Sequence, residues 1–463
     1  MISRALRPWR IGTLAGAAAG LGVGLLARTP TLVSWPEPVR RGYPVGVGAA
    51  VGSVTAVKVW WLTRALADRK PPLPSAVQVG SGLAVVGLAA VAGRIAHRKF
   101  IDSLLASSRQ LEPAFSSPPE LSGMSGSVES VVNVQDLGRE GARYVHTSVT
   151  DAAVAEVMGE GLKREPIRVF IGLDCADSIE ERVALAMSEL HRTGAFDRSV
   201  LLVQAPAGSG YANPTPADIL EIVTRGDCAS VAVAYGLLPS FLSLNRVDVA
   251  ARTQELLLRA IAKALTQRDN KPRILLYGES LGARVQQQAV PAGPIDLDAL
   301  AVDAALWVGT PGGSASDVMH ALCAAESITL DSPSDLPHSL PHPRLRTWFL
   351  EHDGDPVVRF RSELVLNRPE WLPPGGERGR NVPHTMEWHP GLTWSQVLVD
   401  VIYATKIKPG DFQSLGHDYR ADLGPVVAAA YGFTLTSEEL AHLDHVLREL
   451  EVRRAAMIEA PSA

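Results

Sequence analysis

The chain has 463 residues, of which 46% are hydrophobic and 20% are charged, and its formal net charge is −5. This composition excludes a disordered chain, and its three scattered cysteines exclude a disulfide framework and a zinc site. Residues 1–100 carry a net charge of +11, so the rest of the chain carries −16. Because an acidic body repels phosphate backbones, nucleic acid is not expected as a partner.

The basic first hundred residues are also the most apolar, and they predict a membrane region with about three transmembrane helices. Apolar stretches run over 11–27, 43–62 and 76–93, and basic residues flank them. A cleaved signal peptide is the alternative for the first stretch, but no small-x-small cleavage site follows Ala27. We therefore expect an integral, multi-pass protein of the plasma membrane, with the lipid bilayer as a partner. The Lys and Arg residues that flank the three expected helices divide equally between the two sides of the membrane, so the positive-inside rule does not predict the orientation.

Glycines recur every fourth residue in the first apolar stretch and line one face of the expected helix. They are Gly12, Gly16, Gly20 and Gly24. Small residues at this spacing let helix backbones approach closely in lipid, so helix–helix association through this face is one interpretation. The other is that glycine is simply common in membrane helices.

The rest of the chain divides into a linker and a folded domain. Residues 101–130 are rich in Ser, Pro and Gly and are interpreted as the linker, and the domain covers 131–463. Its apolar runs predict strands at 167–173, 199–204, 230–235, 273–277, 304–308 and 346–351. Helices are expected at 178–192, 215–224, 248–268, 282–290, 314–324 and 437–458, the last after a Thr436–Glu439 capping box. Strands that are apolar on both faces, alternating with helices, indicate a mostly parallel sheet covered on both sides.

The fourth expected strand runs into Gly278-Glu279-Ser280-Leu281-Gly282, and a helical stretch follows. This G-x-S-x-G pattern is typical of a nucleophile elbow, where a sharp turn projects the serine hydroxyl above the sheet. The pentapeptide alone is weak, because chance matches occur in chains of this length. Its place after an apolar strand in the middle of the expected sheet favours Ser280 as a nucleophile over an ordinary turn.

A serine nucleophile of this kind needs an acid and then a histidine later in the chain. The last expected strand leads into two acids, Asp353 and Asp355, at the edge of the sheet that carries the elbow. Asp355 is preferred because Pro356 fixes the turn after it, and Asp353 stays the alternative. His417 lies in a loop after a glycine, which suits a base that reaches back to the serine. An ordinary surface-loop histidine is the other interpretation.

Acyl transfer also needs hydrogen-bond donors for an oxyanion. One is expected to be the N–H of Leu281, directly after the elbow serine. The others are expected in a Gly-rich loop after the 199–204 strand, from Gly208 and Ser209. This loop lacks the Lys-Ser or Lys-Thr of a phosphate cradle, so nucleotide binding is discounted. No metal or organic cofactor is needed for this chemistry.

The chain resembles the actinobacterial membrane-anchored α/β-hydrolase family over nearly its whole length. The resemblance is carried by DLGREGARYV (136–145), the long run over 169–203, GESLGA (278–283), ALWVGTPG (305–312) and GDPVVRF (354–360). It implies a serine hydrolase with Ser280 as nucleophile, Asp355 as acid and His417 as base. The membrane region looks shorter than the four or more spans of the family. The resemblance implies no substrate.

These features predict an α/β-hydrolase fold, with helices on both faces of a mostly parallel sheet, preceded by a transmembrane helical region. The expected activity is that of a membrane-anchored serine hydrolase, an esterase or lipase that forms an acyl-enzyme. The anchor suggests a lipid or acylated envelope ester as substrate, by location only. An acyltransferase with the same triad is one alternative. A non-catalytic pseudo-hydrolase that serves as a membrane-bound binding or assembly factor is the other.

Overall fold

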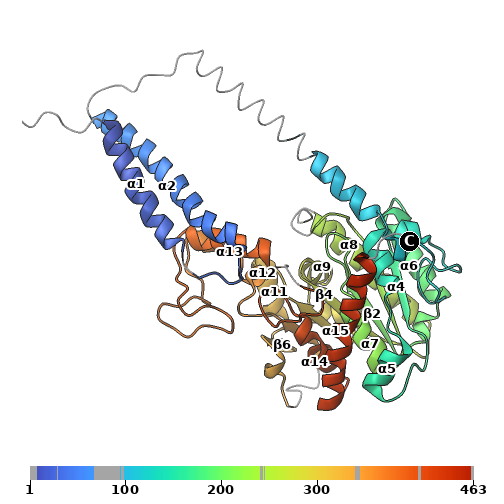
Figure 1. The fold of residues 1–463 in the computed structure, drawn as a ribbon. Helices are drawn as coiled ribbons and strands as arrows, with labels where there is room; N and C mark the ends of the chain where they lie inside the picture. Colours follow the sequence, from blue (N-terminus) through green and yellow to red (C-terminus); the bar gives the residue numbers. More distant parts are fainter. Residues whose placement is uncertain are drawn as a thin grey trace, which may run out of the picture. The chain divides into compact units, whose positions relative to one another are not determined.

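The computed structural model describes residues 8–28, 30–66, 94, 98–239, 243, 246–338, 345–404 and 408–459. The chain forms two compact units (Figure 1), which we name the hairpin unit and the sheet unit. The hairpin unit contains Met1–Phe100 and Ser362–Tyr403, and the sheet unit contains Ile101–Arg361 and Ala404–Ala463. The third expected membrane stretch, 76–93, lies outside the described residues.

The sheet unit is built on seven strands in the order β1-β3-β2-β4-β5-β7-β6, and every neighbouring pair is parallel. The strands are β1 (Ile167–Ile171), β2 (Val200–Ala205), β3 (Cys228–Val233), β4 (Arg273–Glu279), β5 (Ala304–Val308), β6 (Ser327–Leu330) and β7 (Thr347–Leu350). The expected parallel sheet is confirmed. Sequence reasoning missed β6, a short edge strand whose Ser and Thr residues break the apolar run that marks a central strand.

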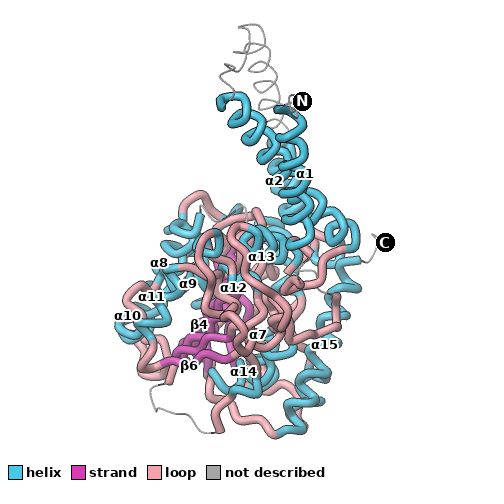
Figure 2. Tube along the Cα trace, turned by 90° about the vertical axis from the view of Figure 1, so that its left-hand side faces the viewer, coloured by secondary structure: helices cyan, strands magenta, loops and turns pink. Residues whose placement is uncertain are grey.

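Two groups of mutually packed helices enclose the sheet, as Figure 2 shows around the magenta strands. One group comprises α6 (Ile179–Arg192), α8 (Val247–Leu265), α9 (Leu281–Ala289) and α11 (Ser314–Cys323). The other comprises α5 (Asp151–Met158), α7 (Thr215–Val223), α14 (Arg420–Ala430) and α15 (Ser437–Glu459). Helix α4 (Gly138–His146) packs on β1, and α10 (Pro294–Ala299) and α12 (Pro356–Arg359) are short. Sequence reasoning assigned no bounds to α4, α5 or α14, and α14 carries an internal Pro425, a residue that disfavours a helix interior.

The segment expected as a linker, 101–130, contains ordered parts in the described structure. Residues 101–109 are helical, and Phe115 and Met124 are almost wholly buried in the core. Ser125 N donates to the carbonyl of Arg168 at 3.0 Å, which attaches this segment to strand β1. Its two large apolar side chains pack inside the sheet unit despite the polar composition around them.

Because all strands run in one direction, their carboxyl ends lie along one edge of the sheet. Strands β2, β4, β5 and β7 are consecutive neighbours, so the turns that follow them lie side by side. Strands β1, β2, β3, β5 and β7 are buried along their full length. A rigid, two-sided core therefore fixes the turns at this edge.

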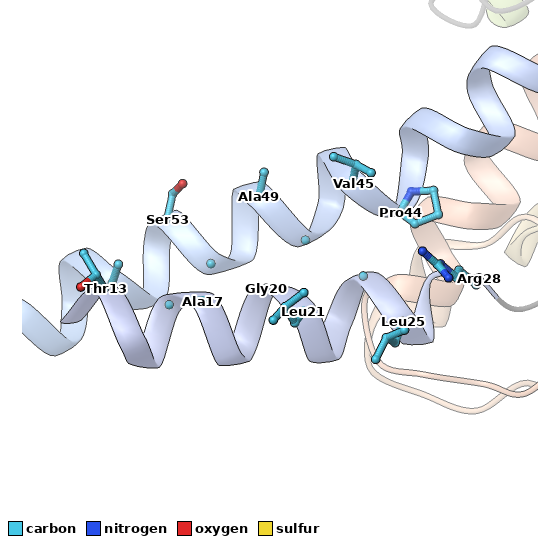
Figure 3. A pocket seen from close by; sticks show the side chains of 15 residues that line it. Thr13, Ala17, Gly20, Leu21, Leu25, Arg28, Pro44, Val45, Ala49 and Ser53 are labelled. Carbon is cyan, nitrogen blue, oxygen red and sulfur yellow. The ribbon is translucent and has the colours of Figure 1, made fainter. Parts of the chain in front are cut away.

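The hairpin unit begins with α1 (Pro8–Leu26) and α2 (Glu37–Leu66), which meet through their glycines. A Cβ added to Gly16 would lie 2.4 Å from the carbonyl oxygen of Gly52, and one on Gly20 would lie 2.6 Å from that of Gly48. Only glycine permits such an approach of two backbones. Figure 3 shows the groove that remains between the helices, about 690 Å³ in volume and lined mainly by small and apolar residues.

One described helix, Glu37–Arg64, is long and apolar enough to cross a membrane. The helix over Arg10–Leu26 is apolar but shorter. Of the two expected spans that lie within the described residues, one thus meets the length requirement of a bilayer.

Helix α13 (Leu392–Tyr403) completes the hairpin unit by binding the turn between α1 and α2. Its buried Asp400 accepts hydrogen bonds from Leu32 N at 3.2 Å and from Trp35 Nε1 at 2.6 Å. The hydroxyls of Ser395 and Tyr43 are 2.6 Å apart. A segment far along the chain therefore supplies the partners that the polar groups of this turn need.

Candidate active site

Ser280 occupies the turn between β4 and α9 with φ 54° and ψ −124°. A positive φ is costly for a residue with a side chain, and it is the conformation that an elbow nucleophile requires. A Cβ on Gly278 would lie 2.7 Å from Ala283 Cα, and one on Gly282 would lie 2.2 Å from Ala205 O. The two glycines of the motif therefore let the start of α9 pack directly on β4 and on the end of β2.

Asp355, directly after the β7 turn, is fully buried and binds His417. Its Oδ2 lies 2.6 Å from His417 Nδ1, and its Oδ1 accepts from Val357 N at 2.8 Å. The alternative acid, Asp353, instead pairs with Arg359 at 2.7 Å. Because a carboxylate accepts, Nδ1 carries the hydrogen and Nε2 is left with the free lone pair of a base.

The backbone at the end of β5 connects Ser280 to His417. Ser280 N donates to Val308 O at 2.8 Å. The next residue, Gly309, has φ 55°, and a Cβ there would lie 2.7 Å from His417 Cε1. The imidazole thus lies against the residue that follows the serine's own hydrogen-bond partner. Gly309 was not a predicted site residue, although it directly follows an expected strand and lies in the ALWVGTPG run (305–312) that carries the resemblance.

The electrostatics around His417 favour its protonated form. Burial lowers the pKa of His417, but the Asp355 carboxylate and its hydrogen bond outweigh burial and raise the pKa above 6.5. Glu279 and Asp418 raise it further. Glu279 is held in place because it accepts from Asn213 Nδ2 at 2.6 Å and from the Tyr277 hydroxyl at 2.7 Å. An imidazolium that forms by taking a proton is therefore stabilised where it forms.

The expected oxyanion donors lie at the start of α9 and in the loop after β2. Leu281 is the first residue of α9, so its N–H has no acceptor within the helix. Gly208 is tightly enclosed, since a Cβ there would lie 2.5 Å from Ser243 Oγ. The loop around Gly208 and Ser209 is closed by a hydrogen bond of 2.8 Å from Ala207 N to Tyr211 O. Because β2 neighbours β4, both groups of donors lie at the same edge of the sheet.

Sequence reasoning missed Tyr419, whose hydroxyl donates to Asp355 Oδ2 at 2.6 Å. Tyr419 belongs to no recognisable motif, and only its place two residues after His417 could have marked it. The burial of its ring beside Asp355 depends on the whole fold of α14 against β5 and β7.

A metal centre and a cysteine nucleophile are two other kinds of site. Within the described ranges, no group of three or more His, Cys, Asp or Glu side chains is placed to hold a metal ion. Cys175 follows β1 at the same edge of the sheet, but burial raises the pKa of its thiol to about 12. A thiol with such a pKa forms almost no thiolate at neutral pH, so Cys175 is not suited to act as a nucleophile.

Comparisons with known proteins identify the family of this chain. A search of curated proteins finds no match. Two solved structures of an acetyl xylan esterase, one of them an iodinated complex, are each 14% identical and match 35% of this chain and 85% of their own, with TM-scores of 0.24 and 0.23. A likeness at this level carries no argument about fold or substrate. A family model described as "Alpha/beta-hydrolase family" matches residues 167–339 and 324–443, which together are more than half of the chain. The chain belongs to the alpha/beta-hydrolase family.

Proposed function

We propose that this chain is a membrane-anchored serine hydrolase that cleaves a carboxylic ester through Ser280, His417 and Asp355. The observation that carries the proposal is the position of His417. Its Nδ1 is bonded to Asp355 at 2.6 Å, while its ring lies against Gly309 beside the strained turn of Ser280. Structural turns rarely combine a serine at positive φ with a buried histidine–carboxylate pair at the same edge of a sheet.

The proposed reaction uses each of these groups in turn. His417 Nε2 takes the hydroxyl proton while Ser280 Oγ attacks the ester carbonyl carbon, and Asp355 stabilises the imidazolium. The N–H groups of Leu281 and of the loop at Gly208 and Ser209 hold the oxyanion, a contribution typically of about 10²–10³-fold in rate. The imidazolium then gives its proton to the leaving alcohol. Water then attacks the acyl carbon while His417 takes a proton from it, the bond between Ser280 Oγ and the acyl group breaks, and His417 returns the proton to Ser280 Oγ as the acid leaves.

The proposed location and substrate follow from the hairpin unit. Helix Glu37–Arg64 supports an anchor, and we extend the proposal to the multi-pass plasma-membrane region expected from 11–27, 43–62 and 76–93. An enzyme held at a bilayer meets esters that partition into it. We therefore propose a lipid or an acylated envelope ester as the substrate class.

The proposal is tested by ester hydrolysis with the full-length protein in detergent and in lipid vesicles. The substrates are p-nitrophenyl esters of increasing chain length, followed by a vesicle-borne acylglycerol. Wild type is expected to hydrolyse them, and Ser280→Ala to lose about 10³-fold or more of kcat/KM. Ser188→Ala is the matched control, because Ser188 is exposed on α6 and its hydroxyl bonds only within that helix.

Two results would change the assignment. Acyl transfer to an added alcohol in strong preference to water would make the chain an acyltransferase with the same triad. Folded wild type that leaves every ester intact would contradict a hydrolase and favour a membrane-bound binding or assembly factor.

A further inference from the structure

The Asp355 carboxylate is held by one more group than its proposed role requires. Its Oδ2 accepts from His417 Nδ1 and from the Tyr419 hydroxyl, each at 2.6 Å. The Tyr419 oxygen in turn accepts from His352 N at 3.1 Å. Asp355 is 0% exposed, Tyr419 1% and His417 6%, so no bulk water competes for these bonds. The Tyr419 hydroxyl is thus fixed by two hydrogen bonds, one that it donates to Asp355 and one that it accepts from His352 N.

A second histidine–carboxylate pair lies next to the first and has no role in the proposed reaction. His352 Nε2 lies 2.8 Å from Asp422 Oδ2, and Nδ1 lies 2.8 Å from the carbonyl oxygen of Gly416. A backbone carbonyl only accepts, so Nδ1 carries a hydrogen, and Nε2 shares a proton with the carboxylate. The His352 ring stacks on Tyr419 with centroids 4.0 Å apart and planes at 26°. His352 therefore holds both the residue before His417 and the ring that reaches Asp355.

We infer that Tyr419 is a positioning residue of the proposed triad, and that the His352–Asp422 pair fixes both Tyr419 and the loop that carries His417. Tyr419 holds Oδ2 of Asp355 toward His417 and takes up part of its negative charge. This inference rests on the proposed function, because it assigns Tyr419 a role in the same site.

The charged groups around this site determine how the loss of the hydroxyl acts. His417 is faced by Asp355, Tyr419, Glu279 and Asp418, and Tyr419 is faced by Asp355, His352 and Glu351. Burial and Asp355 raise the pKa of Tyr419 well above 10, so its hydroxyl remains a donor at all working pH values. Without that donor, more charge stays on Oδ2 and the imidazolium becomes more stable. The pKa of His417 then rises.

The test measures how fast a fluorophosphonate probe modifies the full-length protein in detergent, as a function of pH. The rate rises as His417 loses its proton, so the midpoint of the curve reports the pKa of His417. Tyr419→Phe is expected to move the midpoint up by about half a pH unit or more. Replacement of Tyr419 by 3-fluorotyrosine, a stronger donor that keeps the hydroxyl, is expected to move it down. This second variant decides the question if the phenylalanine variant does not fold.

Tyr431→Phe is the matched control. Tyr431 directly follows α14 and is also fully buried, and its hydroxyl donates to Leu276 O at 2.7 Å, away from the proposed triad. It is expected to lose stability but to keep the wild-type midpoint. A reactive wild type whose midpoint does not change in either Tyr419 variant, or changes in the opposite direction, would overturn this inference and leave the proposed function standing. A folded wild type that does not react with the probe would overturn both.

Discussion

The sheet unit and the hairpin unit use the same apolar residue types in opposite ways. Strands β1, β2 and β3 are buried along their whole length. On the hairpin, Leu21 is 70% exposed and Val45 is 69% exposed. The sheet unit thus matches its apolar side chains to one another, whereas the described part of the hairpin presents them outward. Large apolar side chains exposed in this way are expected where the surroundings are lipid.

The two units also differ in how their backbones come close. In the sheet unit, burial of large side chains drives packing, at about 25 cal/mol for each Å² of apolar surface removed from water. In the hairpin, α1 and α2 meet at Gly16, Gly20, Gly48 and Gly52, where there are no side chains to bury. At the proposed location in a bilayer, apolar burial gives no advantage, and close van der Waals packing of backbones takes its place. Each unit can therefore be disrupted by a different kind of substitution.

The largest expected effect is on the chemistry of the sheet unit. His417→Ala removes the proposed base and is expected to lower kcat/KM for an activated ester by about 10³-fold or more. His442→Ala is the control, since His442 is exposed on α15. Equal activities of the two variants would contradict the role of His417.

The next effect is on the packing of the hairpin. Gly16→Val places side-chain atoms where a Cβ already lies 2.4 Å from Gly52 O, whereas Gly22 has no atom within 4 Å of its Cβ position. Overpacking of this kind costs about 1–3 kcal/mol. We expect Gly16→Val to lower the Tm of the full-length protein in detergent, with Gly22→Val near wild type. Similar Tm values for both would show that the glycine faces do not meet.

A pH-dependent effect on stability is expected at Asp400. Burial raises the pKa of Asp400 to about 7, against the opposing hydrogen bonds from the α1–α2 turn. The carboxyl proton of Asp400 is therefore held more tightly in the folded state than in the unfolded state. The stability that Asp400 contributes is fully present below its unfolded pKa, near 3.8, and is lost as pH rises to about 7. Each pH unit in this window is worth up to about 1.4 kcal/mol.

The measurement for Asp400 is the Tm of the full-length protein in detergent between pH 4 and 8. Wild type is expected to lose stability across this window, and Asp400→Asn, which cannot ionise, to show a flatter curve. Parallel curves for the two proteins would rule out Asp400 as the titrating group.

The smallest effect is expected at Glu279. Its charge raises the pKa of His417 electrostatically, without a hydrogen bond between the two residues. Glu279→Gln keeps an acceptor for Asn213 and Tyr277 but removes the charge. The midpoint of probe reactivity against pH is expected to fall by about a few tenths of a unit. A rise in the midpoint would contradict the electrostatic argument.

The features that could be predicted from the sequence are those set by local chemistry. Continuous apolar runs marked six of the seven strands, and the Thr436–Glu439 capping box is present, with Glu439 N bonded to Thr436 Oγ1 at 3.2 Å. The turn at Ser280 was predictable because a G-x-S-x-G pattern between an apolar strand and a helix is typical of this backbone geometry. The structure also brings His417 and Asp355 together, as the order of the motif suggested, while their catalytic roles stay predictions.

The features that could not be predicted depend on contacts between residues far apart in the sequence. Asp400 binds Leu32, 368 residues away, and no pattern near either residue indicates the other. Tyr419 and His352 acquire their positions only when α14 packs against β7, which places the Tyr419 hydroxyl within reach of both Asp355 and His352 N. The residues that support a site are therefore harder to find from sequence than those that define its motif.

The most direct test of the proposed function is to locate the covalent adduct of a fluorophosphonate probe on the full-length protein by mass spectrometry. The mechanism predicts one adduct, on the peptide that carries Ser280, and its loss in both Ser280→Ala and His417→Ala. An adduct on another residue, or one that forms equally well in His417→Ala, would show that Ser280 is not a nucleophile activated by His417.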